Sequence, residues 1–274
     1  MQPLLERLGL PAGTRALLVS CDELGFSYSS NVAVYNALRS GAATSASIMV
    51  PAPWARAAAA EYRGEDVGVH LVLNAELDLY RWGPITHAPS LLDGDGAFPR
   101  TIDDIWEHAD LDEVHREWRA QIERAVLWGL GVDHLDAHLG GVELKPEFFD
   151  VYLELAEEFH LPVRLPAPEA ERRLGFPFRD LAAERGVISP DRAIALSSLG
   201  STRDEVLASL RELPAGVTEV HLRPALDSPE LRMACPDWQE RVREAELLAD
   251  GPLVTTADGF EPIGYRAFAP LMRP

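Results

Sequence analysis

Short uninterrupted apolar runs alternate along the chain with longer segments whose apolar residues recur at helical spacing. The run Ala16–Val19 contains no polar residue, which is typical of a strand buried on both faces. Residues Ser29–Ser40 carry apolar side chains three and four positions apart, which predicts a helix. Ser29 or Ser30 is the expected N-cap of this helix, and Gly41 is its expected stop signal.

The same alternation continues toward the C-terminal end. Further strands are predicted at Thr44–Val50, Asp66–Leu73, Val132–Asp136, Leu161–Leu165, Ala193–Leu196, Gly216–Leu222 and Leu253–Thr256. Further helices are predicted at Trp54–Tyr62, Asp112–Leu130, Pro146–Phe159, Ala167–Arg185 (interrupted at Pro177), Thr202–Leu213 and Asp237–Ala249, with a short helix or arm over residues 1–14.

Strands that alternate with helices imply parallel strands joined by crossover helices. The pattern predicts an α/β fold, a TIM-like (β/α) barrel that is distorted or has about seven strands. The barrel is expected to form one domain over residues 1–274. An open parallel sheet remains the alternative, although the length fits a barrel better.

Residues 74–110 interrupt the pattern with prolines, glycines and scattered aromatic residues, and no period persists. A long irregular segment in a compact domain is usually functional or disordered, and the aromatic residues argue against disorder. We expect a loop over the strand ends that forms a substrate wall, with Arg81 and Trp82 as contacts. A structural Ω-loop packed by its own aromatic residues is an equal alternative.

Composition excludes several classes of partner. The chain has 274 residues, of which 47% are hydrophobic, but no apolar run approaches the ~18 residues of a membrane helix. The first residues do not have the pattern of a signal peptide, so a cytoplasmic location is expected. The formal net charge of −19 argues against nucleic acids and anionic membranes as partners. The oligomeric state stays open, a homo-oligomer included.

Two cysteines, Cys21 and Cys235, do not make a disulfide framework. The acidic neighbours of Cys21 disfavour a thiolate, so it is not a candidate nucleophile.

Polar residues that carry chemistry follow several of the predicted strands. Asp22 and Glu23 follow the first strand, His70 ends the third, His134–His138 (His-Leu-Asp-Ala-His) ends the next, and Arg223 follows Gly216–Leu222. In a barrel these strand ends converge on one face.

A carboxylate with two imidazoles is a ligand set for a hydrolytic divalent metal ion. Mg²⁺ and Zn²⁺ are the leading candidates, and Mn²⁺ and Co²⁺ are also compatible. Such an ion polarises a carbonyl and lowers the pKa of a bound water toward ~7, and a second carboxylate can take the proton of that water. Asp22 and Glu23 can divide these roles only if the strand end turns, which Gly25 permits.

Each histidine also has a structural alternative. His70 has even odds of being a buried core residue. His138 lies beyond its strand and is the better ligand of its pair, whereas His134 and Asp136 are expected to orient the ligands from behind.

The ordered motifs resemble those of the YdjC-like carbohydrate deacetylase family, which includes the chitooligosaccharide deacetylases. That family opens with a strand ending Ala-Asp-Asp-apolar-Gly, which appears here as Cys21–Gly25. Its downstream asparagine and Thr-Ser segment match Asn31 and Thr44-Ser45. Its Gly-apolar-His-Leu strand appears as Gly68–Leu71, and its His-apolar-Asp-Ser-His element as His134–His138. The segments Tyr80–Pro84 and Pro89–Asp93 look like one branch of the family.

The resemblance covers nearly the whole chain and implies a TIM-like barrel with metal-dependent hydrolysis of an acetamido group on a sugar. It implies Asp22 as the general base, Glu23 as a metal ligand, and His70 and His138 as the two ligating histidines.

Three departures from the family pattern matter. Glu23 stands where the family has aspartate, Leu139–Gly141 replaces further histidines, and the late strand ends in Arg223-Pro224 where the family has His-Pro. An arginine cannot pass a proton to a leaving amine, although it can stabilise an oxyanion or bind a carboxylate. We therefore list Arg223 with Asp22 as a catalytic candidate, and expect slow turnover of simple chitooligosaccharides or a substrate with an anionic group. His221 is expected to lie about 7 Å further back along the strand, at roughly 3.3 Å per residue.

Three interpretations follow. The first is a metal-dependent deacetylase of an N-acetylated sugar. The second is a catalytically weak or silent barrel that binds a sugar or other metabolite. The third is a hydrolase whose substrate is not a sugar, since loop shape sets specificity.

Overall fold

The computed structural model describes residues 3–255 and 258–272 and is built around one parallel sheet. Neighbouring strands follow the order β4-β3-β2-β1-β6-β5, and β7 pairs with β1. The strands are β1 Arg15–Leu24, β2 Ser45–Ile48, β3 Val67–Leu71, β4 Val132–Ala137, β5 Arg192–Ala195, β6 Gly216–Leu222 and β7 Phe260–Pro262.

Strand β1 lies at the centre because it is apolar and buried along nearly its whole length. It pairs with β6 from Arg15 to Cys21 and with β2 from Ser20 to Leu24. Because of this pairing on both sides, the last residues of β1, Asp22 and Glu23 among them, lie at the carboxyl edge of the sheet.

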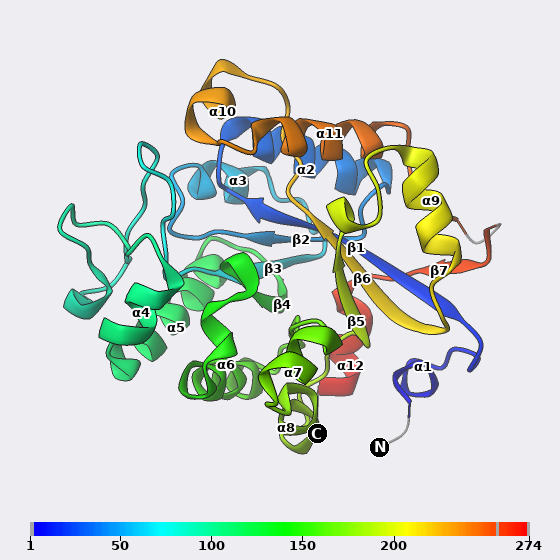
Figure 1. Cartoon of the computed structure of the whole chain (residues 1–274), viewed down its shortest axis with the longest axis horizontal. Coiled ribbons are helices and arrows are strands. Elements are labelled where there is room, and N and C mark those ends of the chain that lie inside the picture. The colour runs from blue at the N-terminus through cyan, green and yellow to red at the C-terminus, as the bar shows by residue number, and fades with distance from the viewer. Residues whose placement is uncertain (1–2, 256–257, 273–274) are drawn as a thin grey trace.

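Helices cover both faces of the sheet (Figure 1). The helices are α1 Leu4–Arg7, α2 Tyr28–Ser40, α3 Ala55–Glu61, α4 Ile102–His108, α5 Leu111–Leu127, α6 Pro146–Phe159, α7 Pro168–Leu174, α8 Phe178–Glu184, α9 Arg203–Arg211, α10 Pro229–Ala234, α11 Trp238–Ala249 and α12 Ala269–Met272. In Figure 1, α2, α3 and α11 lie on one side of the strands, and α5, α6 and α8 lie on the other. The N-cap of helix α2 is Ser27, two residues before Ser29, so the expected N-cap at Ser29 or Ser30 is wrong, because the Ser27 side chain accepts from the Ser30 amide. The helix stops at Gly41, which is left-handed as predicted.

The α/β fold and the distorted barrel are confirmed. Between β4 and β5 the curved sheet is continued only by the segment around Val163. There Leu135 bridges Val163 and exchanges hydrogen bonds with the Pro162 carbonyl and the Arg164 amide, and the Val163 amide donates to the Ile188 carbonyl at 2.8 Å. The predicted strand Leu161–Leu165 is therefore wrong as a strand, because only one of its residues joins the ladder.

The last predicted strand is also misplaced. Residues 253–255 form no strand, Thr256 lies outside the described residues, and the final strand is β7. Strand β7 pairs with only the first three residues of β1. A strand this short has no long apolar run, so the hydrophobic pattern of the sequence could not reveal it.

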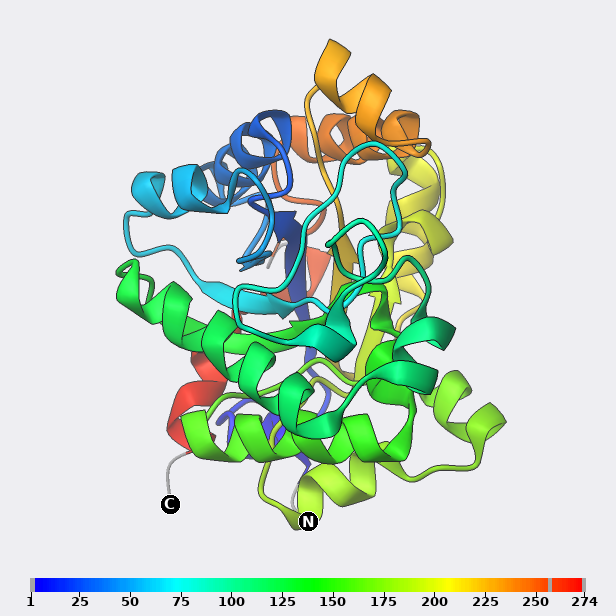
Figure 2. The same ribbon diagram turned by 90° about the vertical axis from the view of Figure 1, so that its left-hand side faces the viewer.

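The expected insertion over residues 74–110 is irregular from β3 to α4 apart from the 3-10 turn Pro89–Leu91. Its last part is wrong as irregular chain, because Ile102–His108 forms α4, capped by the Thr101 side chain. Figure 2 shows these loops in front of the sheet. Within residues 3–255 and 258–272, no helix is long and apolar enough to cross a membrane.

Candidate metal centre

The end of β1 turns within the acidic pair itself. Glu23 adopts a left-handed conformation with φ 62°, and Gly25 follows with φ 95°. A Cβ on Gly25 would lie 2.8 Å from the Cα of Ala55, so only glycine fits where α3 begins. The turn lets Asp22 and Glu23 face different partners, as the sequence required.

Three donors from three strand ends converge in the interior. Ligand atoms of Glu23, His70 and His138 all lie within 4.8 Å of one another, and all three side chains are buried. His70 Nε2 lies 3.0 Å from His138 Nδ1, and that Nδ1 lies 3.8 Å from Glu23 Oε1. The structure thus brings together the three residues that the sequence analysis assigned as ligands.

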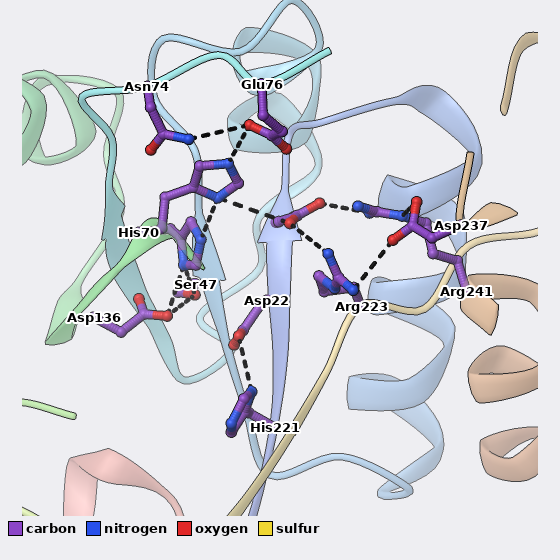
Figure 3. Close-up of polar contacts among 12 residues, drawn as sticks. Asp22, Ser47, His70, Asn74, Glu76, Asp136, His221, Arg223, Asp237 and Arg241 are labelled. Carbon is purple, nitrogen blue, oxygen red and sulfur yellow. Dashed lines mark hydrogen bonds and ion pairs between the residues drawn. The ribbon is translucent and has the colours of Figure 1, made fainter. Parts of the chain in front are cut away.

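Each of the three side chains is held from behind by a group of opposite charge (Figure 3). His70 Nδ1 contacts Asp136 at 2.6 Å, and His138 Nε2 contacts Glu76 at 3.0 Å. Arg241 donates to the outer oxygen of Glu23 at 2.5 Å. The outer nitrogens of both rings contact carboxylates, and the inner nitrogens, His70 Nε2 and His138 Nδ1, face each other at 3.0 Å. The position between these inner nitrogens suits a positive centre, either a shared proton or a cation, so this donor set fits a bound cation.

The charges around the site keep its carboxylates ionised. Burial opposes ionisation of Glu23, but the charges of Arg241, His138 and Arg223 outweigh it and lower the pKa of Glu23 to about 2. Burial likewise favours neutral His70, but the charge and hydrogen bond of Asp136 raise the pKa of that ring. The site is therefore electrostatically prepared for a cation.

Asp22 belongs to a second cluster beside the first. Arg164 donates two hydrogen bonds to it, at 2.7 and 2.8 Å, and a further one to Asp136 at 2.8 Å. Burial of Asp22 opposes ionisation, but Arg164 and His221 hold its pKa well below the usual range. Glu219 completes the cluster, since it accepts hydrogen bonds from Arg164 and from Tyr265.

The end of β6 places an arginine and a histidine near the acidic pair. Arg223 lies 3.8 Å from Glu23 Oε1 and 3.1 Å from Asp237. His221 Nδ1 lies 3.5 Å from Asp22, although His221 stands two residues before Arg223 on the strand, as expected. In the parallel register His221 pairs with Ser20, two residues before Asp22, and its side chain spans the remaining distance.

A cavity of about 640 Å³ opens onto this edge of the sheet. Asp22, Glu23, His70, Arg164, His221 and Arg223 line it. The candidate base and two of the three candidate ligands are thus accessible to a small molecule.

His134 and Asp136 have different surroundings. Asp136 contacts His70 and also accepts a hydrogen bond from Ser47 at 3.1 Å. The His134 ring instead stacks on Tyr265 at 3.8 Å, and neither of its nitrogens has a hydrogen-bond partner among the described residues. Asp136 is thus placed to orient a ligand, whereas His134 packs the interior.

Arg81 and Trp82 are turned inward, and neither belongs to the described residues that line the cavity. Arg81 donates to the carbonyls of Ala75 and Phe98 and pairs with Asp93. Trp82 is 4% exposed and donates to the Asn74 carbonyl, and its ring centroid lies 6.0 Å from that of His138. Their geometry favours the Ω-loop interpretation, and a substrate contact stays a prediction.

The sequence analysis missed three residues that support the site. Arg164 and Glu76 lie at or after predicted strand ends, so the rule that located the histidines could have found them. Arg241 lies inside a charged helix, where nothing in the sequence distinguishes it from the other charged residues.

Comparisons with known proteins agree with this geometry. A model of the family described as YdjC-like protein matches residues 16–257. A carbohydrate deacetylase of Thermus thermophilus is 37% identical over 270 residues, which cover 96% of this chain and 97% of that protein. A chitooligosaccharide deacetylase of Serratia marcescens is 32% identical over 168 residues, which cover 58% of this chain and 62% of that protein. A solved structure from Enterococcus faecalis shares the fold with a TM-score of 0.77 and 24% identity, covering 93% of this chain and 99% of that chain.

Proposed function

Because this chain belongs to the YdjC-like protein family, we propose that it is a metal-dependent hydrolase that removes the acetyl group from an N-acetylated sugar. One observation carries the proposal: Glu23, His70 and His138 converge beside the ionised Asp22 at a cavity. The relatives named carbohydrate deacetylase and chitooligosaccharide deacetylase support the substrate class.

In this proposal Glu23 Oε1, His70 Nε2 and His138 Nδ1 hold one divalent ion. Such an ion supplies Lewis acidity toward the amide carbonyl and lowers the pKa of water. Mg²⁺, Zn²⁺, Mn²⁺ and Co²⁺ are all compatible with one carboxylate and two imidazoles.

Asp22 accepts a proton from the attacking water. It is ionised at neutral pH, because Arg164 holds its carboxylate in a two-point pair. The same pair fixes the direction of the carboxylate, which general-base catalysis requires. Replacing Asp22 with asparagine is expected to lower kcat by ~10²–10⁴-fold and to leave the metal content unchanged.

Arg223 faces the cavity as a cation. Its pKa is raised, since the charges of Glu23 and Asp237 outweigh its burial, so it donates hydrogen bonds but gives up no proton. Stabilising the developing oxyanion is the role open to it. Recognition of an anionic substrate group stays a prediction, because two acids already contact this guanidinium.

The test combines elemental analysis with acetate release from chitobiose and longer oligomers. We expect one divalent ion per chain in the wild type, and loss of both metal and activity in His70→Ala and His138→Ala. Stoichiometric metal in both variants would refute the ligand assignment. Metal and sugar binding without acetate release would instead support the silent sugar-binding barrel.

A further inference from the structure

A buried acid outside the metal cluster lies on the wall of the same cavity. Glu143 belongs to the 3-10 turn Val142–Leu144 that follows β4, and it is 4% exposed while lining the cavity. Its Oε2 has no hydrogen-bond partner among the described residues. An unpartnered buried carboxyl oxygen is costly, so a structural role does not account for it.

The surroundings of Glu143 keep a proton on this group. Burial and the charge of Asp136 raise its pKa, and its own backbone amide, Arg164 and His70 lower it, with a net pKa of about 7. From α6, Tyr152 is the neighbouring titratable group, and it stays neutral because burial raises its pKa. At neutral pH a substantial fraction of Glu143 therefore presents an O–H group.

Deacetylation needs such a group. Breaking the bond between carbon and nitrogen releases an amine, and the nitrogen must receive a proton as that bond breaks. Asp22 enters the reaction as a carboxylate and Arg223 keeps its protons, so neither carries this proton at the start. His221 also lines the cavity, so experiment must separate its role from that of Glu143.

We propose that Glu143 is the general acid that protonates the leaving nitrogen. This inference rests on the proposed function. Water attacks the acetyl carbon while Asp22 takes one of its protons, and the Glu143 proton then passes to the nitrogen as the bond to the acetyl carbon breaks. Acetic acid and the free amine leave, Asp22 is protonated and Glu143 is a carboxylate, and the acetic acid then ionises in solvent. Exchange of one proton with solvent at each residue restores the starting state.

Glu143→Gln tests this assignment, because glutamine keeps the size of the side chain and cannot give up a proton. We expect kcat on chitobiose to fall by ~10²–10⁴-fold while the metal content stays at the wild-type level. In the wild type, kcat/KM falls as the pH rises above about 7, since the acid must carry its proton, and this limb is absent in Glu143→Gln.

The leaving group provides a second readout. An activated aryl acetate releases a phenolate that needs no proton, so Glu143→Gln should hydrolyse it within a few-fold of the wild-type rate. A merely structural defect would lower both reactions. Glu147→Gln, an exposed change in the first turn of α6, is the matched control and should leave both reactions unchanged.

Two results overturn the assignment and separate it from the proposed function. If Glu143→Gln turns over chitobiose at the wild-type rate, Glu143 is not the general acid. The same holds if the fall in kcat/KM at high pH persists in Glu143→Gln and disappears in His221→Asn. Both results leave the proposed deacetylase function standing. Absence of acetate release from the metal-loaded wild type refutes the deacetylase function, and the assignment with it.

Discussion

At the scale of single residues, Glu23 shows how a longer acid fits the end of β1. Its carboxylate reaches one methylene further than aspartate, and the left-handed backbone at φ 62° redirects that reach. Arg241 holds the outer oxygen, with its guanidinium 4.8 Å from the ring centroid of Phe26. The inner oxygen is thereby left facing His138.

We predict that Arg241→Met destabilises the fold by about 3–5 kcal/mol, because it leaves the Glu23 carboxylate buried without its cation. Arg241→Lys keeps the positive charge but lacks the planar guanidinium group, so it should lose less stability than Arg241→Met. Urea unfolding at neutral pH measures both. Arg232→Met removes a solvent-exposed pair with Asp227 and should change the stability far less. Equal losses in the two methionine variants would contradict this prediction.

His134 leads to a pH prediction. Burial lowers its pKa from 6.5 to about 3, so the folded protein holds it neutral, while the unfolded chain takes up a proton below about pH 6.5. The folded state is therefore fully favoured above pH 6.5 and loses stability as the pH falls toward 3. Between pH 7 and pH 5 this linkage is worth about 2 kcal/mol.

His134→Phe keeps the ring stacked on Tyr265 and removes the titration. We expect its stability to fall less than that of the wild type between pH 7 and 5, by about 2 kcal/mol. Denaturant melts at the two pH values measure the difference. His87→Phe, at an exposed position, is the control, and an unchanged pH dependence in His134→Phe would exclude this origin.

At the scale of elements, the strand ends carry the site and the connections brace it. The loop from β3 to α4 supplies Glu76 behind His138, and Arg81 ties that loop to the Ala75 and Phe98 carbonyls. The predicted substrate wall therefore serves, in this structure, as support for a candidate ligand.

The end of β6 sets the charge beside the candidate ligands. Arg223 lies 3.8 Å from Glu23 Oε1, and a guanidinium repels a divalent cation held by that oxygen. We predict that Arg223→Met tightens divalent metal binding roughly tenfold, equivalent to about 1.4 kcal/mol, whereas Arg223→Lys stays near the wild type. Competition with a metal-chelating indicator measures the affinity, and weaker binding in the methionine variant would contradict the prediction.

At the scale of the whole molecule, the order of strands and helices was largely predictable, because fully buried strands and amphipathic helices have distinct periods. The elements that escaped prediction are those held by few contacts. Val163 joins the barrel by one bridge, and β7 by three residues against β1.

The candidate site was predictable where strand ends carry histidines and acids, since parallel strands deliver them to one edge. The arginines that pair with those acids were not predictable. The contact between Glu23 and Arg241 spans 218 positions, and that between Asp22 and Arg164 spans 142, and no local pattern encodes such pairs.

The central position of β1 also constrains the order of events during synthesis. This strand leaves the ribosome first, yet its neighbour β6 and the arginine that neutralises Glu23 are translated about 200 residues later, at roughly 5–20 residues per second. Until then one edge of β1 is unpaired and Glu23 lacks its cation. A chain that stops at residue 214 should therefore lack a protease-resistant core, and cooperative unfolding of that fragment would refute this expectation. The nascent chain thus needs protection for roughly ten seconds or more, until its last third has been translated.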